Sequence, residues 1–184
     1  MEVDMSIIKQ KMKIRVNVRW MIKKDINRVL DIEEESFEFP WSINDFFECL
    51  NHKKNLALVA EHDGQVIGFM IINRFAFIDR HIEFIIHLLN FAVHPDWRKR
   101  GVGKQMISEL IADLPKRPGL KKIIAKVREK NLDAQLFLKK LKFRAVRIIH
   151  DCYEECPEED VYVMRYLDKS DPTIVNRIAK YPII

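Results

Sequence analysis

The 184-residue sequence is short of cysteine and glycine and has no long apolar run. Its cysteines, Cys49, Cys152 and Cys156, are odd in number, and none forms the paired Cys-x2-Cys or Cys/His spacing of a zinc site. This pattern favours free thiols in a reducing cytoplasm. Because there is no apolar run of about 18 residues and no signal-peptide core, we expect neither a membrane span nor secretion.

Two common phosphate-binding motifs are absent as well. A Walker loop has the pattern Gly-x4-Gly-Lys-Ser/Thr. If Gly103-Lys104 were its Gly-Lys pair, position 98 would be glycine and position 105 Ser or Thr, but the chain has Arg98 and Gln105. The dinucleotide fingerprint needs three glycines, and this region has two, Gly101 and Gly103. A nucleotide site of either kind is therefore not predicted.

The composition is that of a folded globular protein. Apolar residues make up 48% and charged residues 32%, and the length fits one domain with a tail at most. The net charge of +5 suits an anionic ligand or partner: a cofactor phosphate, an acidic protein or RNA. Excess lysine is equally typical of a plain solvated surface, so the charge does not choose among these.

The stretch from Leu88 to Leu114 carries the strongest pattern. Leu88 to Val93 is an apolar run typical of a buried strand, and Pro95 ends it because proline has no backbone donor. Apolar residues at helical spacing predict a helix that begins at about Gly101. The loop between them is basic and contains glycine, and the free amides of a helix N-terminus attract anions. This pattern predicts an anion-binding loop, although an ordinary strand-to-helix turn would look similar.

The remaining periodicity predicts an α/β protein. Strands are expected at residues 13–22, 56–60, 66–73, 75–92 with a break near Asp79-Arg80, 121–127, 143–149 and 161–167. Helices are expected at residues 25–35, 42–50, about 101–114 and 131–141, with Ser42 and Asn131 as N-caps. Asp63-Gly64 is a strong hairpin signal.

The basic loop also resembles a known motif. Arg98-x-x-Gly101-x-Gly103, preceded by Phe91-Ala92-Val93-x-Pro95, is similar to the acetyl-CoA pyrophosphate loop of the GCN5-related N-acetyltransferase (GNAT) superfamily. Further matches to its ribosomal-protein alanine N-acetyltransferase (RimI-type) branch are Phe39-Pro40-Trp41-Ser42, Val127-Arg128-x-x-Asn131, Leu141-x-Phe143, Tyr153 and the strand 160–166.

The resemblance covers about residues 13–167. It implies a central, mostly antiparallel mixed sheet of about seven strands flanked by about four helices. Residues 1–12 would then be a leader and residues 168–184 a C-terminal tail.

The resemblance also assigns roles to residues. It implies that acetyl-CoA binds at Phe91, Ala92, Val93, Arg98, Lys99, Arg100, Gly101, Val102, Gly103, Lys104 and Asn131. The acceptor would bind at Phe39, Pro40, Trp41 and Tyr153, and Tyr153 is also a catalytic candidate. From the residues alone, the aromatic turn at 37–41 is equally a hydrophobic plug.

His87 is the first candidate for a general base. It lies six residues before Val93, at the position of the base in histone-type GNAT enzymes, and histidine titrates near neutral pH. A hydrogen-bonded strand histidine is the alternative, and Glu83 is a weaker candidate base. Two residues depart from the RimI pattern: Lys126 replaces its glutamate and Leu138 its proton-donating tyrosine.

We therefore expect a cytoplasmic enzyme that transfers acetyl from acetyl-CoA to a protein N-terminal amine, with a ribosomal protein as the specific hypothesis. Alternatives are a GNAT enzyme acting on lysine or a small amine, and a catalytically silent acetyl-CoA-binding module. A further alternative is a nucleic-acid-binding domain, which only the net positive charge supports. No metal, membrane or direct nucleic-acid partner is expected, and the chain would be a monomer or weak dimer.

Overall fold

The computed structural model describes residues 13–78, 82–112, 120–150 and 159–167, which form two compact units. The first unit contains residues 13–72 and 90–112, and the second contains residues 73–78, 82–89, 120–150 and 159–167. The expected leader and tail lie outside the described residues. The domain boundaries at residues 13 and 167 therefore stay predictions.

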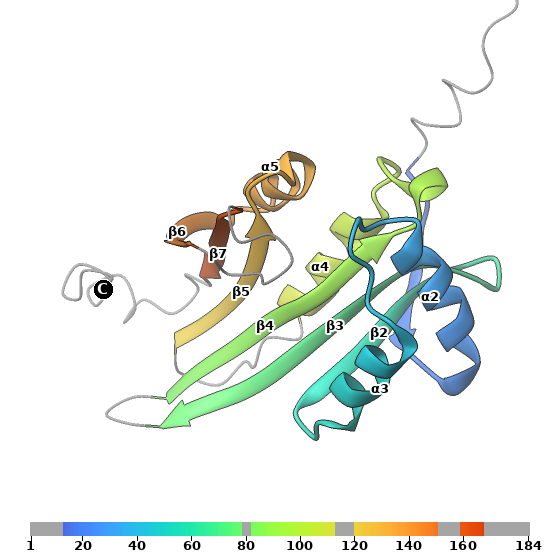
Figure 1. The fold of residues 1–184 in the computed structure, drawn as a ribbon, viewed down its shortest axis with the longest axis horizontal. Helices are drawn as coiled ribbons and strands as arrows, with labels where there is room; N and C mark the ends of the chain where they lie inside the picture. Colours follow the sequence, from blue (N-terminus) through green and yellow to red (C-terminus); the bar gives the residue numbers. More distant parts are fainter. Residues whose placement is uncertain (1–12, 79–81, 113–119, 151–158, 168–184) are drawn as a thin grey trace, which may run out of the picture. The chain divides into compact units, whose positions relative to one another are not determined.

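Seven strands form one sheet in the order β1-β2-β3-β4-β5-β7-β6 (Figure 1). The strands are β1 (Asn17–Trp20), β2 (Asn55–His62), β3 (Gln65–Ile78), β4 (Ile82–Val93), β5 (Leu120–Arg128), β6 (Arg144–Ile149) and β7 (Val161–Leu167). The helices are α2 (Ile26–Glu34), α3 (Ile43–Asn51), α4 (Val102–Ala112) and α5 (Leu132–Lys140), with 3-10 turns η1 (Lys23–Asp25) and η2 (Pro95–Trp97). The predicted seven strands and four helices are confirmed.

The sheet is mixed, as predicted. β1 pairs with β2, β5 with β7, and β6 with β7, all antiparallel. β4 and β5 are parallel, with a register that runs from Glu83 opposite Leu120 to Leu88 opposite Ala125. Both strands continue past this paired stretch, β4 to Val93 and β5 to Arg128.

Two strand predictions need correction. The expected strand at 13–22 is confined to Asn17–Trp20, because the segment before it bonds to a helix side chain instead: Gln105 Nε2 donates to the Ile14 carbonyl at 2.6 Å. The strands expected at 66–73 and from residue 75 to the break near Asp79-Arg80 are one strand, β3, which runs from Gln65 to Ile78, so the interruption at Arg74 is corrected. Pairing in the sheet overrides the polar Asn73-Arg74 pair, which interrupts the apolar run.

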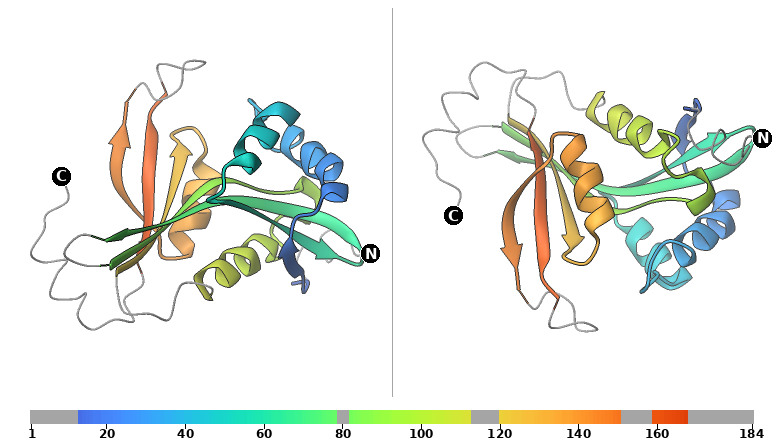
Figure 2. Two further views of the ribbon diagram at one scale, coloured as in Figure 1. Left: turned by 90° about the horizontal axis from the view of Figure 1, so that it is seen from below. Right: turned by 90° about the horizontal axis from the view of Figure 1, so that it is seen from above.

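The first unit is built in layers. Figure 2 shows α2 and α3 on one side of β2 and β3, and α4 on the other. Ser42 caps α3, with its Oγ accepting the Asp45 N–H at 3.2 Å, as predicted. On the α4 side, a Cβ built at Gly68 would lie 3.0 Å from the Ala92 carbonyl oxygen and 3.3 Å from Met106 Sδ. Glycine at position 68 therefore permits close packing of β3 against β4 and α4.

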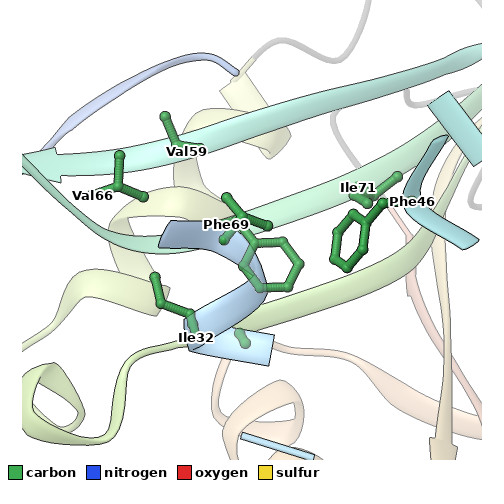
Figure 3. Close-up of a cluster of buried hydrophobic side chains, with 8 residues drawn as sticks. Ile32, Phe46, Val59, Val66, Phe69 and Ile71 are labelled. Atoms are coloured by element: carbon green, nitrogen blue, oxygen red, sulfur yellow. The ribbon is translucent and has the colours of Figure 1, made fainter. Parts of the chain in front are cut away.

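The core beneath α2 and α3 is a cluster of buried apolar side chains (Figure 3). Phe46 of α3 belongs to it, with its ring edge-on to Trp41 at 5.5 Å and to Phe69 at 5.8 Å between centroids. The other members are Val29, Ile32, Val59, Val66, Ile71 and Ala92.

In the second unit, α5 lies against one face of β5 and β7 (Figure 2). Leu138 of α5 and Ile123, Ala125 and Val127 of β5 are buried. Phe143 packs on Tyr166 with ring centroids 5.6 Å apart. Lys122 and Lys126 alternate with the buried residues of β5, so they belong to the opposite face.

The Phe46 environment predicts a large cost for truncation. Phe46→Ala removes a ring with 0% exposure and should lower the free energy of unfolding by about 3–5 kcal/mol. Phe47→Ala, which truncates a half-exposed neighbour, is the matched control and should change it by less than about 0.5 kcal/mol. Urea denaturation of both variants checks this, and equal costs would contradict the described core.

Candidate functional site

The loop between β4 and α4 has the geometry of an anion-binding turn. Lys99 and Gly101 have left-handed backbones, with φ of 61° and 88°. The first backbone bond of α4 joins the Gln105 N–H to the Gly101 carbonyl at 3.0 Å. Three backbone N–H groups come before Gln105 in the helix, so they have no partner within it: those of Val102, Gly103 and Lys104. The predicted loop residues are therefore brought together with three amides at the helix start.

Gly101 is required for its conformation. A Cβ at this position would meet nothing closer than Lys13 Cγ at 3.7 Å, so there is space for a side chain. Its φ of 88° nevertheless lies in the region that residues with a Cβ rarely adopt. The backbone turn that aims the amides thus depends on glycine here.

The Arg98 side chain makes two hydrogen bonds within the protein. Its Nε donates to the Val93 carbonyl at 2.8 Å, and a terminal nitrogen donates to Ser36 Oγ at 2.9 Å. The Val93 carbonyl, at a predicted cofactor-binding residue, therefore already accepts one hydrogen bond from within the protein. Arg98, Lys99 and Lys104 are the exposed cations of the loop, and Arg98 is the one whose bonds within the protein are described above.

Arg100 packs on an aromatic ring. Its guanidinium carbon lies 4.9 Å from the centre of the Trp97 ring, whose edge contact with His62 has a centroid distance of 5.3 Å. Its Nε is buried and has no hydrogen-bond partner in the part of the chain that the structure describes. The stacking fixes the path of the loop before Gly101.

Gln105 is a structural residue that sequence reasoning missed. Its Oε1 accepts the Val16 N–H at 3.2 Å, and its Nε2 donates to the Ile14 carbonyl at 2.6 Å. One side chain in the first turns of α4 thus holds the segment before β1. Its position directly after Gly103-Lys104 gave no sequence signal beyond exclusion of the Walker motif.

The aromatic turn at 37–41 has residues both in the core and at the surface, and its role in acceptor binding stays a prediction. Trp41 packs edge-on to the buried Phe46 ring and joins the core, as a plug would. Phe39 and Pro40 are exposed. A surface for an acceptor can therefore come from Phe39 and Pro40, while Trp41 anchors the turn.

A buried carboxylate holds this turn against β4. Glu33 of α2 is 1% exposed, and its Oε1 accepts the Trp41 N–H at 2.9 Å. The Asn90 amide of β4 donates to both carboxylate oxygens at 3.1 and 3.0 Å. Burial raises the pKa of Glu33, while the bonds from Trp41 and Asn90 oppose that rise.

Sequence reasoning missed Glu33 and Asn90, but both had a signal. Glu33 continues the apolar helical stripe of Val29 and Ile32, and Asn90 interrupts the apolar run of the central strand. A polar residue at a buried position needs a partner, and these two are partners of each other.

His87 lies in the second unit, on β4, opposite Ile124 in the register with β5. It is half-buried. Its pKa is lowered first by burial and then by the positive charges of Lys126 and Lys122, which flank Ile124. Both effects favour the neutral form of the imidazole at pH 7.

Other predicted residues have mixed outcomes. Asn131 caps α5, with its Oδ1 accepting the Ala134 N–H at 3.0 Å, and its cofactor contact stays a prediction. Leu138 is buried and packs in the core. Tyr153 lies outside the described residues, and the side chain of Glu83 is likewise not described.

The described ranges contain no group of three or more His, Cys, Asp or Glu residues arranged to hold a metal ion. None of their helices is long and apolar enough to cross a membrane.

Comparisons with known proteins give one answer. The model of the acetyltransferase (GNAT) family matches residues 26–143. The N-alpha-acetyltransferase of Sulfolobus acidocaldarius is 25% identical over 159 residues, 84% of this chain and 94% of that protein. The ribosomal protein bS18-alanine N-acetyltransferase of Salmonella typhimurium is 30% identical over 142 residues, 76% of this chain and 89% of that protein.

A solved structure shows the same fold. The crystal structure of Arabidopsis thaliana NAA60 in complex with acetyl-CoA superposes with a TM-score of 0.70 at 21% identity, covering 84% of this chain and all of that one. The family model spans more than half of the chain and includes the loop between β4 and α4. The chain therefore belongs to the acetyltransferase (GNAT) family and is an N-acetyltransferase that uses acetyl-CoA.

Proposed function

We propose that this enzyme acetylates the N-terminal α-amine of a protein, and that the acceptor is a ribosomal protein in the cytoplasm. The name of the Sulfolobus relative specifies N-alpha-acetylation, and that of the Salmonella relative specifies an alanine of ribosomal protein bS18. Both match most of this chain. They support the acceptor class, and the charges around His87 support it independently.

The positive charges around His87 are the observation that favours an α-amine over a lysine side chain as the acceptor. The neighbours that lower the pKa of His87 are cations, Lys126 and Lys122. A positive environment also disfavours a protonated acceptor amine. An α-amine, with a pKa of about 8, is partly neutral at pH 7, whereas a lysine, with a pKa of about 10.4, is almost entirely protonated. The α-amine therefore binds in its reactive form at far lower cost.

The loop residues fit the proposed donor. Acetyl-CoA carries a pyrophosphate. The amides of residues 102–104, which have no partner within the helix, and the exposed Lys99 and Lys104 offer hydrogen bonds and positive charge to it. When bound, acetyl-CoA supplies an activated thioester. We assign the edge of β4 at Phe91, Ala92 and Val93 to its positioning; the Val93 carbonyl also accepts one bond from Arg98.

The acceptor-binding residues are Phe39 and Pro40, held in place by Trp41, and Tyr153 by resemblance. His87 accepts the proton that the acceptor's ammonium must lose before it can attack, and then releases that proton to solvent. With Leu138 buried in the core, the described residues supply no side-chain acid at the position where the RimI pattern has tyrosine. Orientation of the two substrates then accounts for most of the rate enhancement.

An acceptor assay tests the proposal directly. We expect acetyl transfer to a peptide with a free N-terminal alanine and none to an N-terminally blocked peptide with an internal lysine, both followed by mass spectrometry. Transfer to the lysine alone would change the acceptor class. Transfer to neither peptide, with acetyl-CoA binding confirmed, would leave a small-amine enzyme or a silent binding module.

The role of His87 predicts a pH-dependent loss. His87→Ala should lower kcat/KM about 100-fold at pH 6.5, where the acceptor amine is protonated and needs a base. The deficit should shrink to less than about tenfold at pH 9, because an amine with a pKa near 8 is already neutral there. His150→Ala, which changes an exposed histidine paired with Asp160, is the control. A deficit independent of pH would remove His87 from proton transfer.

The conformation of Gly101 predicts that its substitution weakens the binding of acetyl-CoA. Gly101→Ala and Gly64→Ala both place a side chain at positive φ in open space, so each should cost about 1 kcal/mol of stability. Gly101→Ala should also raise the KM for acetyl-CoA about tenfold by misaligning one charge-assisted hydrogen bond. Gly64→Ala, in the β2–β3 hairpin, should not, and equal KM effects would contradict the loop assignment.

A further inference from the structure

One face of the sheet in the second unit is strongly basic. In the hydrogen-bonded register, His87 of β4 lies opposite Ile124 of β5, Ile124 opposite Arg165 of β7, and Arg165 opposite Arg144 of β6. Register partners share a face, so these four residues form one row across four strands. The flanking rows add Lys122, Lys126 and Arg147 to the same face. We call Lys122, Lys126, Arg144, Arg147 and Arg165 the basic face.

The three arginines of this face are the part that no described carboxylate pairs with. Glu83 is the one acidic residue in the β4, β5, β6 and β7 segments of this unit, and it has the same strand parity as His87, four positions earlier. At the start of β7, Glu159 binds Arg128 at 3.0 Å and Asp160 binds His150 at 2.7 Å. Among the residues described, Arg144, Arg147 and Arg165 have no ion pair, and Arg144 and Arg147 are exposed.

The register makes this arrangement costly. Arg144 and Arg165 are direct cross-strand partners, and side chains at such positions have Cβ atoms about 5 Å apart. Like charges directly opposite each other destabilise a sheet. An external anion over the pair would turn that repulsion into attraction, so the pair indicates a ligand.

We infer that the basic face binds an acidic segment of the acceptor protein, just after the acetylated residue. This inference rests on the proposed function, because it places the acceptor's α-amine at His87. His87 shares the row with Arg165 and Arg144, which links the basic face to the reacting amine rather than to a separate partner.

The strand spacing sets the positions of the acidic residues. Neighbouring strands lie about 4.8 Å apart, so β7 is about 10 Å and β6 about 14 Å from the strand that carries His87. An extended peptide advances about 3.4 Å per residue. With residue 1 at His87, a peptide that crosses the strands places residues 3 to 5 over Arg165 and Arg144. An acceptor with Asp or Glu at these positions is therefore preferred, and a Lys- or Arg-rich N-terminus is repelled.

Three peptides test the inference: a free N-terminal alanine followed by serine, with glutamate, glutamine or lysine at positions 3 to 5. We expect kcat/KM to be about tenfold higher for the glutamate than for the glutamine peptide, mainly through KM, and lowest for the lysine peptide. The preference should shrink as salt rises toward 1 M. Acetylation of all three at equal rates would overturn the inference and keep the proposed function, whereas acetylation of none would contradict the function itself.

A charge reversal identifies the face. Arg165→Glu places opposite charges across from each other in the register with Arg144, so the variant should fold at least as stably as the parent in a thermal melt. It should abolish the preference for the glutamate peptide. Lys139→Glu makes the same charge change on exposed α5 and should leave the preference intact. Loss of the preference in both variants, or in neither, would contradict the basic face.

Binding of single-stranded oligouridine tests whether the basic face binds RNA instead of an acidic peptide. We expect it to bind weakly and not to compete with the glutamate peptide. Salt-sensitive RNA binding that Arg165→Glu removes, together with an unchanged peptide preference, would assign the face to RNA and overturn the acceptor inference.

Discussion

The geometry of the first unit depends on one buried carboxylate. Glu33 receives the Trp41 N–H and both contacts from the Asn90 amide, so it ties α2 to the aromatic turn and to β4. Burying a carboxylate is unfavourable unless donors surround it, and the loss of one donor leaves an uncompensated group that costs about 1–3 kcal/mol. That dependence gives the turn a defined position: Trp41 enters the core beside Phe46, and Phe39 and Pro40 are presented to solvent.

Local patterns in the sequence predicted the elements and the loop well. The turn around Gly101, the Asp63-Gly64 hairpin and the Ser42 and Asn131 caps each follow from chemistry within a few residues, which a sequence displays directly. The alternation in β5 likewise separates buried Ile123 and Ala125 from the lysines of the other face.

Contacts between distant residues could not be predicted in the same way. Glu33 and Asn90 are 57 positions apart, and Gln105 reaches a segment 91 positions away. Each residue was visible as a polar group in an unusual place, but its partner depends on how the elements pack. The register that sets Arg165 opposite Arg144 is likewise a property of the sheet, because neither strand alone indicates its neighbour. The assignment of Tyr153 rests on resemblance and lies outside the described residues.

Arg98 shows how a motif residue can serve the protein rather than its ligand. Its guanidinium spans the end of β4 and Ser36, which follows α2, and one nitrogen serves each contact. A lysine has a single point of charge and cannot reproduce this fork. The arginine of the motif therefore links two chain segments by hydrogen bonds. Its replacement by lysine would preserve the net charge of the loop but weaken the contacts that position the loop before α4.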